Sequence, residues 1–230
     1  MMPLSYLKQR QQMLEQSNNF YTSSGIHVYT KDEMMNDLVD LESVVARFES
    51  ILPAHVRDGV EMIIVGHFDE FDERDINAFY KDGALYISNV QTDNNDLIDD
   101  LIHETAHSVE EKYGYEIYAD QKIKDEFLRR RIHLYNILWK MGFKTPKATF
   151  EDVEYNQEFD EFLFHTVGYD KLTEILKGVM VTPYAATSLR EYFATAFTEF
   201  YFHPDSHNYL KKVAPEVYKK LVKLHHLDRA

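Results

Sequence analysis

Residues 103 to 107 read His-Glu-Thr-Ala-His, and this string constrains the chain more than any other part of its sequence. Residues four apart in an α-helix lie about 40° apart around the axis, so His103 and His107 would share one face. Two imidazoles on one face can hold a Zn²⁺ ion, and Glu104 beside the first histidine can act as general base toward an attacking water. The string therefore predicts a metal-binding helix. The alternative is a pair of solvated histidines on a polar helix face.

The residues around this string have the pattern of an amphipathic helix. Between Asn95 and Gly114 the apolar residues fall within one half of a helical wheel: Leu97, Ile98, Leu101, Ile102, Ala106, Val109 and Tyr113. The polar residues Asn94 to Asp96 offer N-cap side chains, and Gly114 is expected to end the helix. We expect the helix to bury its apolar side in a core and to turn the two histidines toward a cleft.

A hydrolytic zinc site normally has a third protein ligand and leaves the fourth position to water. A metzincin would need glycine and histidine three and six residues after His107, but Glu110 and Tyr113 occupy those positions. A thermolysin-like site would need a glutamate about twenty residues further on, and Glu126 lies near that spacing, in a segment that resembles an ordinary charged helix. The metzincin layout is excluded, and Glu126 stays as an alternative ligand.

Another candidate ligand lies much further along the chain. Ser188 can cap a helix whose apolar stripe consists of Leu189, Tyr192, Phe193, Ala196, Phe197 and Phe200. Glu191 points almost opposite to this stripe, in the first turn, and is a candidate third ligand. A glutamate favoured there by the helix dipole alone is the alternative. Glu199 lies closer to the stripe and is the weaker candidate.

At these residues the chain resembles a known family. The run Glu191-Tyr-Phe-Ala-Thr-Ala-Phe197, with Tyr184 seven residues before the glutamate, resembles the metallopeptidase family of the anthrax lethal factor catalytic domain. The Pro-Pro endopeptidases belong to the same group. The resemblance covers roughly residues 95–117 and 184–226.

The resemblance implies a zincin-like metallopeptidase with one Zn²⁺ per chain, held by His103, His107 and Glu191. It also implies that the Tyr184 hydroxyl assists at the metal. Two features depart from the family pattern. Thr195 stands where the family has a second glutamate, and the Thr-Ala pair between the two histidines is smaller than the usual pair.

Composition limits the class of protein. A chain of 230 residues with 44% hydrophobic content suits one packed domain of ordinary core size. No apolar run approaches membrane-spanning length and the first residues lack the form of a signal peptide, so we expect a cytoplasmic protein, leaderless export or association with a virion. Cysteine is absent, which removes disulfides and thiolate ligands. The net charge of −14 disfavours nucleic acid and anionic membranes as partners.

The order of expected elements indicates an α+β fold. Residues 1–30 are expected to form an N-terminal arm or short helix, and residues 31–230 a zincin-like metallopeptidase domain. A helix over 32–52, a strand over 60–65 and an acidic loop over 69–75 come first. Paired strands over 76–80 and 84–90, joined at the turn signal Lys81-Asp82-Gly83, then lead to the histidine helix. Helices over 118–141, 155–177 (broken near Gly168), 187–202 and 214–226 follow it. This order predicts a small mixed sheet, the active-site helix and a mostly helical C-terminal half.

The expected function is that of a zinc-dependent endopeptidase in which Glu104 moves the proton. In zincins an extended peptide adds to the last strand before the histidine helix, so residues 84–89 are the candidate substrate strand, and a plain core strand is the alternative. The rival functions are a non-catalytic zincin-fold binding module and a structural protein such as a virion component. His165, His203 and His207 lack ligand spacing and are predicted to be surface or capped histidines.

Overall fold

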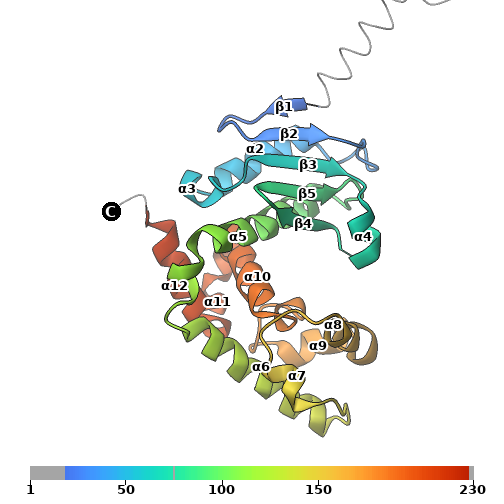
Figure 1. The fold of residues 1–230 in the computed structure, drawn as a ribbon, viewed down its shortest axis with the longest axis vertical. Coiled ribbons are helices and arrows are strands. Elements are labelled where there is room, and N and C mark those ends of the chain that lie inside the picture. The colour runs from blue at the N-terminus through green and yellow to red at the C-terminus, as the bar shows by residue number, and fades with distance from the viewer. Residues whose placement is uncertain (1–18, 75, 228–230) are drawn as a thin grey trace, which may run out of the picture. The chain divides into compact units, whose positions relative to one another are not determined.

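The computed structural model describes residues 19–74 and 76–227. They divide into two compact units, the first ending at Ser108 and the second beginning at Val109. We call them the sheet unit and the helical unit. The boundary falls inside one helix, α5 (Asn94–Tyr118), which therefore belongs to both. The fold is α+β with a small mixed sheet and a mostly helical C-terminal half, as the sequence predicts (Figure 1).

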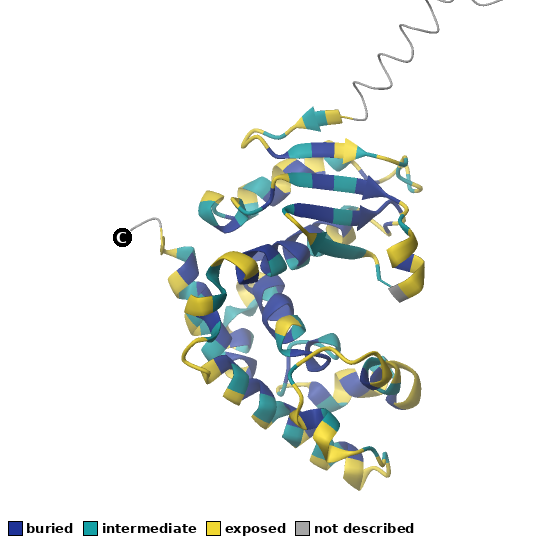
Figure 2. Cartoon of the chain, in the orientation of Figure 1, coloured by how far each residue is buried: buried dark blue, intermediate teal, exposed yellow. Residues whose placement is uncertain are grey.

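The sheet has five strands in the order β1-β2-β3-β5-β4. Their bounds are β1 (Asn19–Tyr21), β2 (His27–Thr30), β3 (Met62–Gly66), β4 (Ala78–Lys81) and β5 (Ala84–Ser88). β2, β3 and β5 run parallel, whereas β1 and β4 pair antiparallel with their neighbours. Ile63, Val65, Leu85 and Ile87 are fully buried, whereas the alternate positions Met62, Ile64 and Tyr86 are partly buried (Figure 2). One face of these strands is fully buried and the other is at least partly covered, which explains why they read as nearly continuous apolar runs.

The β4–β5 hairpin has the turn that the sequence predicts. Asp82 has φ 50° and Gly83 has φ 80°, so both central residues adopt the left-handed conformation of a type I′ turn. Residues 84–89, however, do not offer a free edge for an extended substrate. β5 pairs with β3 on one side and with β4 on the other, so it is a core strand. The edge strand on this side of the sheet is β4.

Residues 19–30 do not form the arm or short helix predicted for residues 1–30, because they supply β1 and β2. β1 has only three residues and β2 only four, so neither is long enough to show the alternation typical of a strand. Pairing with β3 gives β2 its place in the sheet. The remainder of the predicted arm, residues 1–18, lies outside the described residues.

Two further expectations for the sheet unit are wrong. The helix predicted from residue 32 begins only at Leu41, as α2 (Leu41–Ile51), because the Asp40 side chain accepts the Ser43 amide and caps the helix there. The acidic segment predicted as a loop contains a helix, α4 (Asp69–Arg74), whose Phe71 is buried against aromatic neighbours. A short helix, α3 (Ala54–Arg57), follows the break at Pro53.

The histidine helix α5 forms as predicted, but its ends differ from the prediction. The Asp93 carboxylate accepts the amides of Asn95 (2.7 Å) and Asp96 (3.1 Å), so the capping residue precedes those predicted. The backbone leaves the helical conformation at Tyr113 (φ −113°, ψ 19°), one residue before the predicted end at Gly114, so a break lies close to the predicted position. A second helical segment continues from this kink to Tyr118, and Gly114 does not take the positive φ of a helix-ending turn.

The helical unit is organised around α10 (Leu189–Phe202), which packs against α6, α11 and α12. Its other elements are α6 (Lys122–Lys140), α7 (Lys147–Glu151), α8 (Gln157–Glu161), the π-helix η1 (Phe162–Val167), α9 (Tyr169–Leu176), the 3₁₀ turn η2 (Tyr184–Ala186), η3 (Pro204–Ser206), α11 (His207–Val213) and α12 (Pro215–His225). The predicted break at Gly168 is present, with φ 88°. Within the described residues, no helix has the length and apolar character to cross a membrane.

Candidate metal centre

The two histidines lie on α5 as their spacing requires. Their ring centroids are 5.4 Å apart and the ring planes are inclined by 76°. The apolar side of the same helix is fully buried at Leu97, Ile98, Leu101, Ile102 and Ala106. Glu104 is only 7% exposed, although it is a carboxylate. The helix thus fixes the backbone of all three residues through its buried side.

Glu191 is positioned by the start of α10. The Ser188 hydroxyl accepts the Glu191 amide at 3.1 Å, which is the capping bond that the sequence predicts. Tyr192, Phe193, Ala196, Phe197 and Phe200 are buried, so the predicted apolar stripe does face the core. Glu191 itself is partly buried on the other side of the helix. The cap and the stripe together fix the direction in which this carboxylate leaves the backbone.

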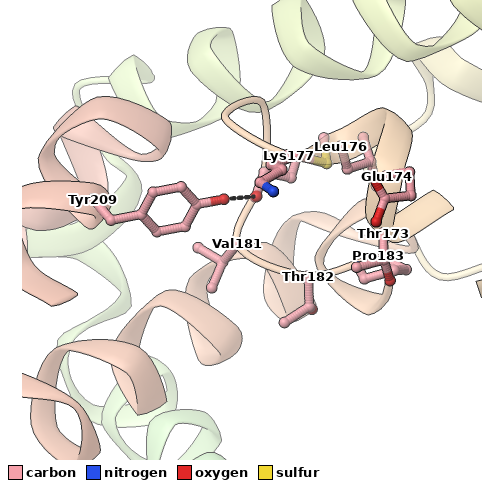
Figure 3. A pocket seen from close by; sticks show the side chains of 9 residues that line it. Thr173, Glu174, Leu176, Lys177, Val181, Thr182, Pro183 and Tyr209 are labelled. Carbon is pink, nitrogen blue, oxygen red and sulfur yellow. Dashed lines mark hydrogen bonds between the residues drawn. The ribbon is translucent and has the colours of Figure 1, made fainter. Parts of the chain in front are cut away.

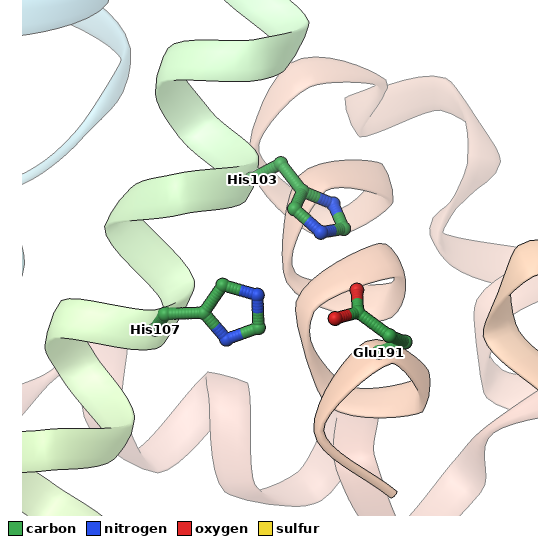
Figure 4. A group of neighbouring side chains, drawn as sticks. All are labelled: His103, His107 and Glu191. Carbon is green, nitrogen blue, oxygen red and sulfur yellow. The ribbon is translucent and has the colours of Figure 1, made fainter. Parts of the chain in front are cut away.

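His103, His107 and Glu191 come together as one group. Each offers one ligand atom, and these atoms all lie within 4.8 Å of one another. Figure 4 shows the two imidazoles of α5 and the carboxylate of α10 turned toward one another. Two imidazole nitrogens and one carboxylate oxygen are a donor set of hydrolytic zinc sites, in which ligand atoms about 2.0–2.2 Å from the ion stand roughly 3.4 Å apart. The donor types suit such a site, and the three side chains could hold a metal ion.

The turns of α5 that precede the histidines carry several carboxyl groups, among them that of Asp100. Asp100 lies one helical turn before Glu104. Burial raises the pKa of Asp100 to about 7; a hydrogen bond from Gln91 at 2.9 Å opposes this shift, and the charges of Asp96 and Glu104 add to it. Glu104 therefore lies in a region of α5 where negative charges repel one another.

Another carboxylate of this helix, Glu110, has partners that the sequence does not reveal. In the sequence this position serves only to exclude a metzincin, yet Glu110 is buried and forms an ion pair with Arg190, the residue before Glu191. Its side chain also accepts a hydrogen bond from the Tyr118 hydroxyl. The signal that could have found it is its spacing, because a residue seven after His103 returns to the same helix face.

The other candidate site residues, Tyr184, Glu126 and Glu199, lie outside the ligand group. Tyr184 lies on η2, directly before α10, and is partly buried. Glu126, the alternative ligand, lies in α6, where its carboxylate accepts the Tyr192 hydroxyl (2.9 Å) and the Glu216 amide (3.0 Å). It is 2% exposed and is not a member of the ligand group. Glu199 is also outside that group.

The histidines without ligand spacing, His165, His203 and His207, lie outside the ligand group. His165 and His203 are exposed. The His207 ring stacks on Phe200 with a centroid distance of 4.5 Å, and its Nε2 lies 2.7 Å from the Phe200 carbonyl oxygen. These surroundings agree with the prediction of surface or capped histidines.

A pocket of about 180 Å³ in the helical unit lies apart from these residues. It is lined by α9, by the connection from Lys177 to Pro183 and by Tyr209 of α11 (Figure 3). The Tyr209 hydroxyl donates to the Met180 carbonyl at 3.1 Å. None of the predicted site residues lines this pocket, although Tyr184 follows Pro183 directly in the chain.

Comparison with known proteins adds no relative, since no family model, curated protein or solved structure matches the chain. The resemblance to the lethal factor family therefore depends on the motifs around the two histidines and Glu191.

Proposed function

We propose that the protein is a zinc-dependent endopeptidase with a zincin-like fold. The observation that carries the proposal is the group formed by His103, His107 and Glu191, whose ligand atoms lie within 4.8 Å of one another. His107 and Glu191 lie 84 residues apart in the chain, and each belongs to a separate sequence motif. Two independent motifs that meet at one point support a shared function better than either motif alone.

A Zn²⁺ ion bound by these residues would polarise the scissile carbonyl and lower the pKa of the attacking water. Glu104 is the general base. It takes the proton of that water and then delivers it to the leaving amine. Because Glu104 is only 7% exposed, it acts in a region of reduced dielectric, where its charge interacts more strongly with its neighbours.

Tyr184 is the candidate for stabilising the oxyanion that develops on the carbonyl. It lies on η2 just before α10, and the Thr187 amide and hydroxyl both donate to its backbone carbonyl, at 3.0 and 2.8 Å. These bonds hold the turn from which its side chain projects. The proposal predicts that Tyr184→Phe lowers kcat and changes zinc affinity little.

An extended peptide is the proposed substrate. Because β5 is paired on both sides, the peptide would add to the edge strand β4 (Ala78–Lys81) by main-chain hydrogen bonds. The Phe79 ring stacks on Tyr86 of β5 at 4.5 Å, which stabilises this edge. We propose β4 as the substrate strand in place of residues 84–89.

The test is cleavage of a peptide library by the zinc-loaded protein and by a Glu104→Gln variant. We expect the variant to bind zinc and to lose cleavage by at least a factor of about 10². Glu116→Gln, on the exposed side of the same helix, is the matched control and should cleave like the wild type. A Glu104→Gln variant that cuts as fast as the wild type would refute the mechanism. A wild-type protein that binds one zinc and cuts no peptide would instead indicate a non-catalytic binding module.

A further inference from the structure

One face of α5 continues past the two histidines to a buried carboxylate. Glu110 lies seven residues after His103, which places it about 20° from His103 around the helix axis. His103, His107 and Glu110 therefore form one stripe along the helix. Glu110 is 7% exposed, so its charge must be compensated by close partners.

Both oxygens of Glu110 have a partner. Oε1 accepts the Tyr118 hydroxyl, and Oε2 lies 3.3 Å from Nε of Arg190. Burial raises the pKa of Tyr118 well above its ordinary value, and the charge of Glu110 adds to this, so the phenol keeps its proton and donates. We call Glu110, Tyr118 and Arg190 the Glu110 network.

The Glu110 network fixes the start of α10 at two points on either side of Glu191. Arg190 is the residue before Glu191 and is tied to Glu110. Phe193, two residues after Glu191, packs its ring against Tyr118 at a centroid distance of 6.1 Å. The Ser188 cap holds the Glu191 amide itself. The backbone at Glu191 is therefore held against α5 one helical turn beyond His107.

We propose that the Glu110 network is a positioning device that holds Glu191 at ligand distance from His103 and His107. The inference deepens the proposed function, because it rests on the metal site. It assigns Glu110, Tyr118 and Arg190 no contact with the substrate. They act through Glu191, in the way that outer partners of metal ligands orient those ligands.

Zinc affinity, measured by competition with a chromogenic chelator, tests the proposal. Glu110→Gln and Arg190→Ala should each weaken zinc binding about 10- to 100-fold. Arg190 is 59% exposed in its side chain, so its truncation is the variant that best preserves the fold. Glu116→Gln removes an exposed carboxylate from the same helix and should leave the affinity unchanged. Circular dichroism of the metal-free variants checks that the fold is retained.

A double-mutant cycle separates positioning from a general loss of structure. If Glu110 acts through Glu191, Glu110→Gln should weaken zinc binding in the wild type and change it less than about twofold in a Glu191→Ala background. An equal fold-change in both backgrounds would overturn the proposal. The same measurement on Tyr118→Phe should give the same pattern, because the phenol hydroxyl is the other donor to Glu110.

The outcomes also distinguish this proposal from the proposed function. A wild-type protein that binds no zinc would overturn both. A wild-type protein that binds zinc while Glu110→Gln and Arg190→Ala match Glu116→Gln would overturn only the positioning role. Zinc binding that responds to Glu110 as expected, in a protein that cuts no peptide, would support positioning and contradict the endopeptidase.

Discussion

Two buried tyrosines of α10 differ in one respect that can be measured. Tyr192 is fully buried, and its hydroxyl lies 2.9 Å from Oε1 of Glu126 and 3.1 Å from the Val213 carbonyl. Tyr201 is 8% exposed, and its hydroxyl has no hydrogen-bond partner among the described residues. The same change, tyrosine to phenylalanine, therefore removes a satisfied hydroxyl at one position and an unsatisfied hydroxyl at the other.

The expected changes in the free energy of unfolding follow from the hydrogen bonds that each hydroxyl makes. A hydrogen bond to a charged group contributes about 1.5–3 kcal/mol to stability. Tyr192→Phe also leaves the Glu126 carboxylate with the Glu216 amide, 3.0 Å away, as its remaining donor, so we expect a loss of about 2–3 kcal/mol. Tyr201→Phe removes a buried hydroxyl that makes no hydrogen bond among the described residues. We expect it to be neutral or to stabilise the protein by up to about 1 kcal/mol.

Urea unfolding followed by tryptophan fluorescence measures both changes. The single tryptophan, Trp139, lies on α6 in the same unit as both tyrosines, so one probe reports on both variants. The expected difference between the two variants is at least about 2 kcal/mol. Equal losses at Tyr192 and Tyr201 would refute the reasoning, because they would show that ring packing alone determines the effect.

Three further outcomes are expected. Burial raises the pKa of Asp100 from its ordinary value of 3.8 to about 7 in the folded protein, so its contribution to stability is present at low pH and is lost as the pH rises from about 4 to 7. Asp100→Asn should remove this pH dependence from the melting temperature measured across that range. Gly114→Ala should raise the free energy of unfolding by about 0.5–1 kcal/mol, since an added Cβ meets nothing within 4 Å. Gly59→Ala should lower it, because the added Cβ would lie 2.4 Å from Oγ of Ser108. A Gly59→Ala variant as stable as the wild type would contradict this packing. Zinc at about 100 times its Kd should stabilise the wild type by about 2.7 kcal/mol, and the same concentration should have little effect on the melting of Glu191→Ala.

Local signals predicted the elements that carry the candidate site. The Ser188 cap, the apolar stripe of α10 and the turn at Asp82 and Gly83 depend on neighbours in the chain, and all three are present in the structure. At Gly114 the local signal is right only in part. A kink at Tyr113 interrupts α5 one residue before Gly114, but a second helical segment continues to Tyr118, and Gly114 does not take the positive φ of a helix-ending turn.

What the sequence did not reveal depends on contacts between distant residues. β5 is an interior strand because β3 pairs with it on one side and β4 on the other. The order of strands in a sheet depends on pairing between segments, so the sequence of β5 alone does not determine it. Glu110 and Arg190 are 80 residues apart, so their ion pair could not be read from local periodicity. Glu126 matched a ligand spacing, yet its carboxylate bonds Tyr192 and Glu216 within the helical unit.

X-ray absorption at the zinc edge, on protein loaded with one equivalent of zinc, tests the central claim most directly. We expect two imidazole nitrogens at about 2.0–2.1 Å and a carboxylate oxygen at about 2.0–2.2 Å. The imidazole contribution should fall by half in a His103→Ala variant, and the oxygen contribution should change in Glu191→Ala. Spectra that are identical in the wild type and both variants would show that zinc binds elsewhere and would contradict the account.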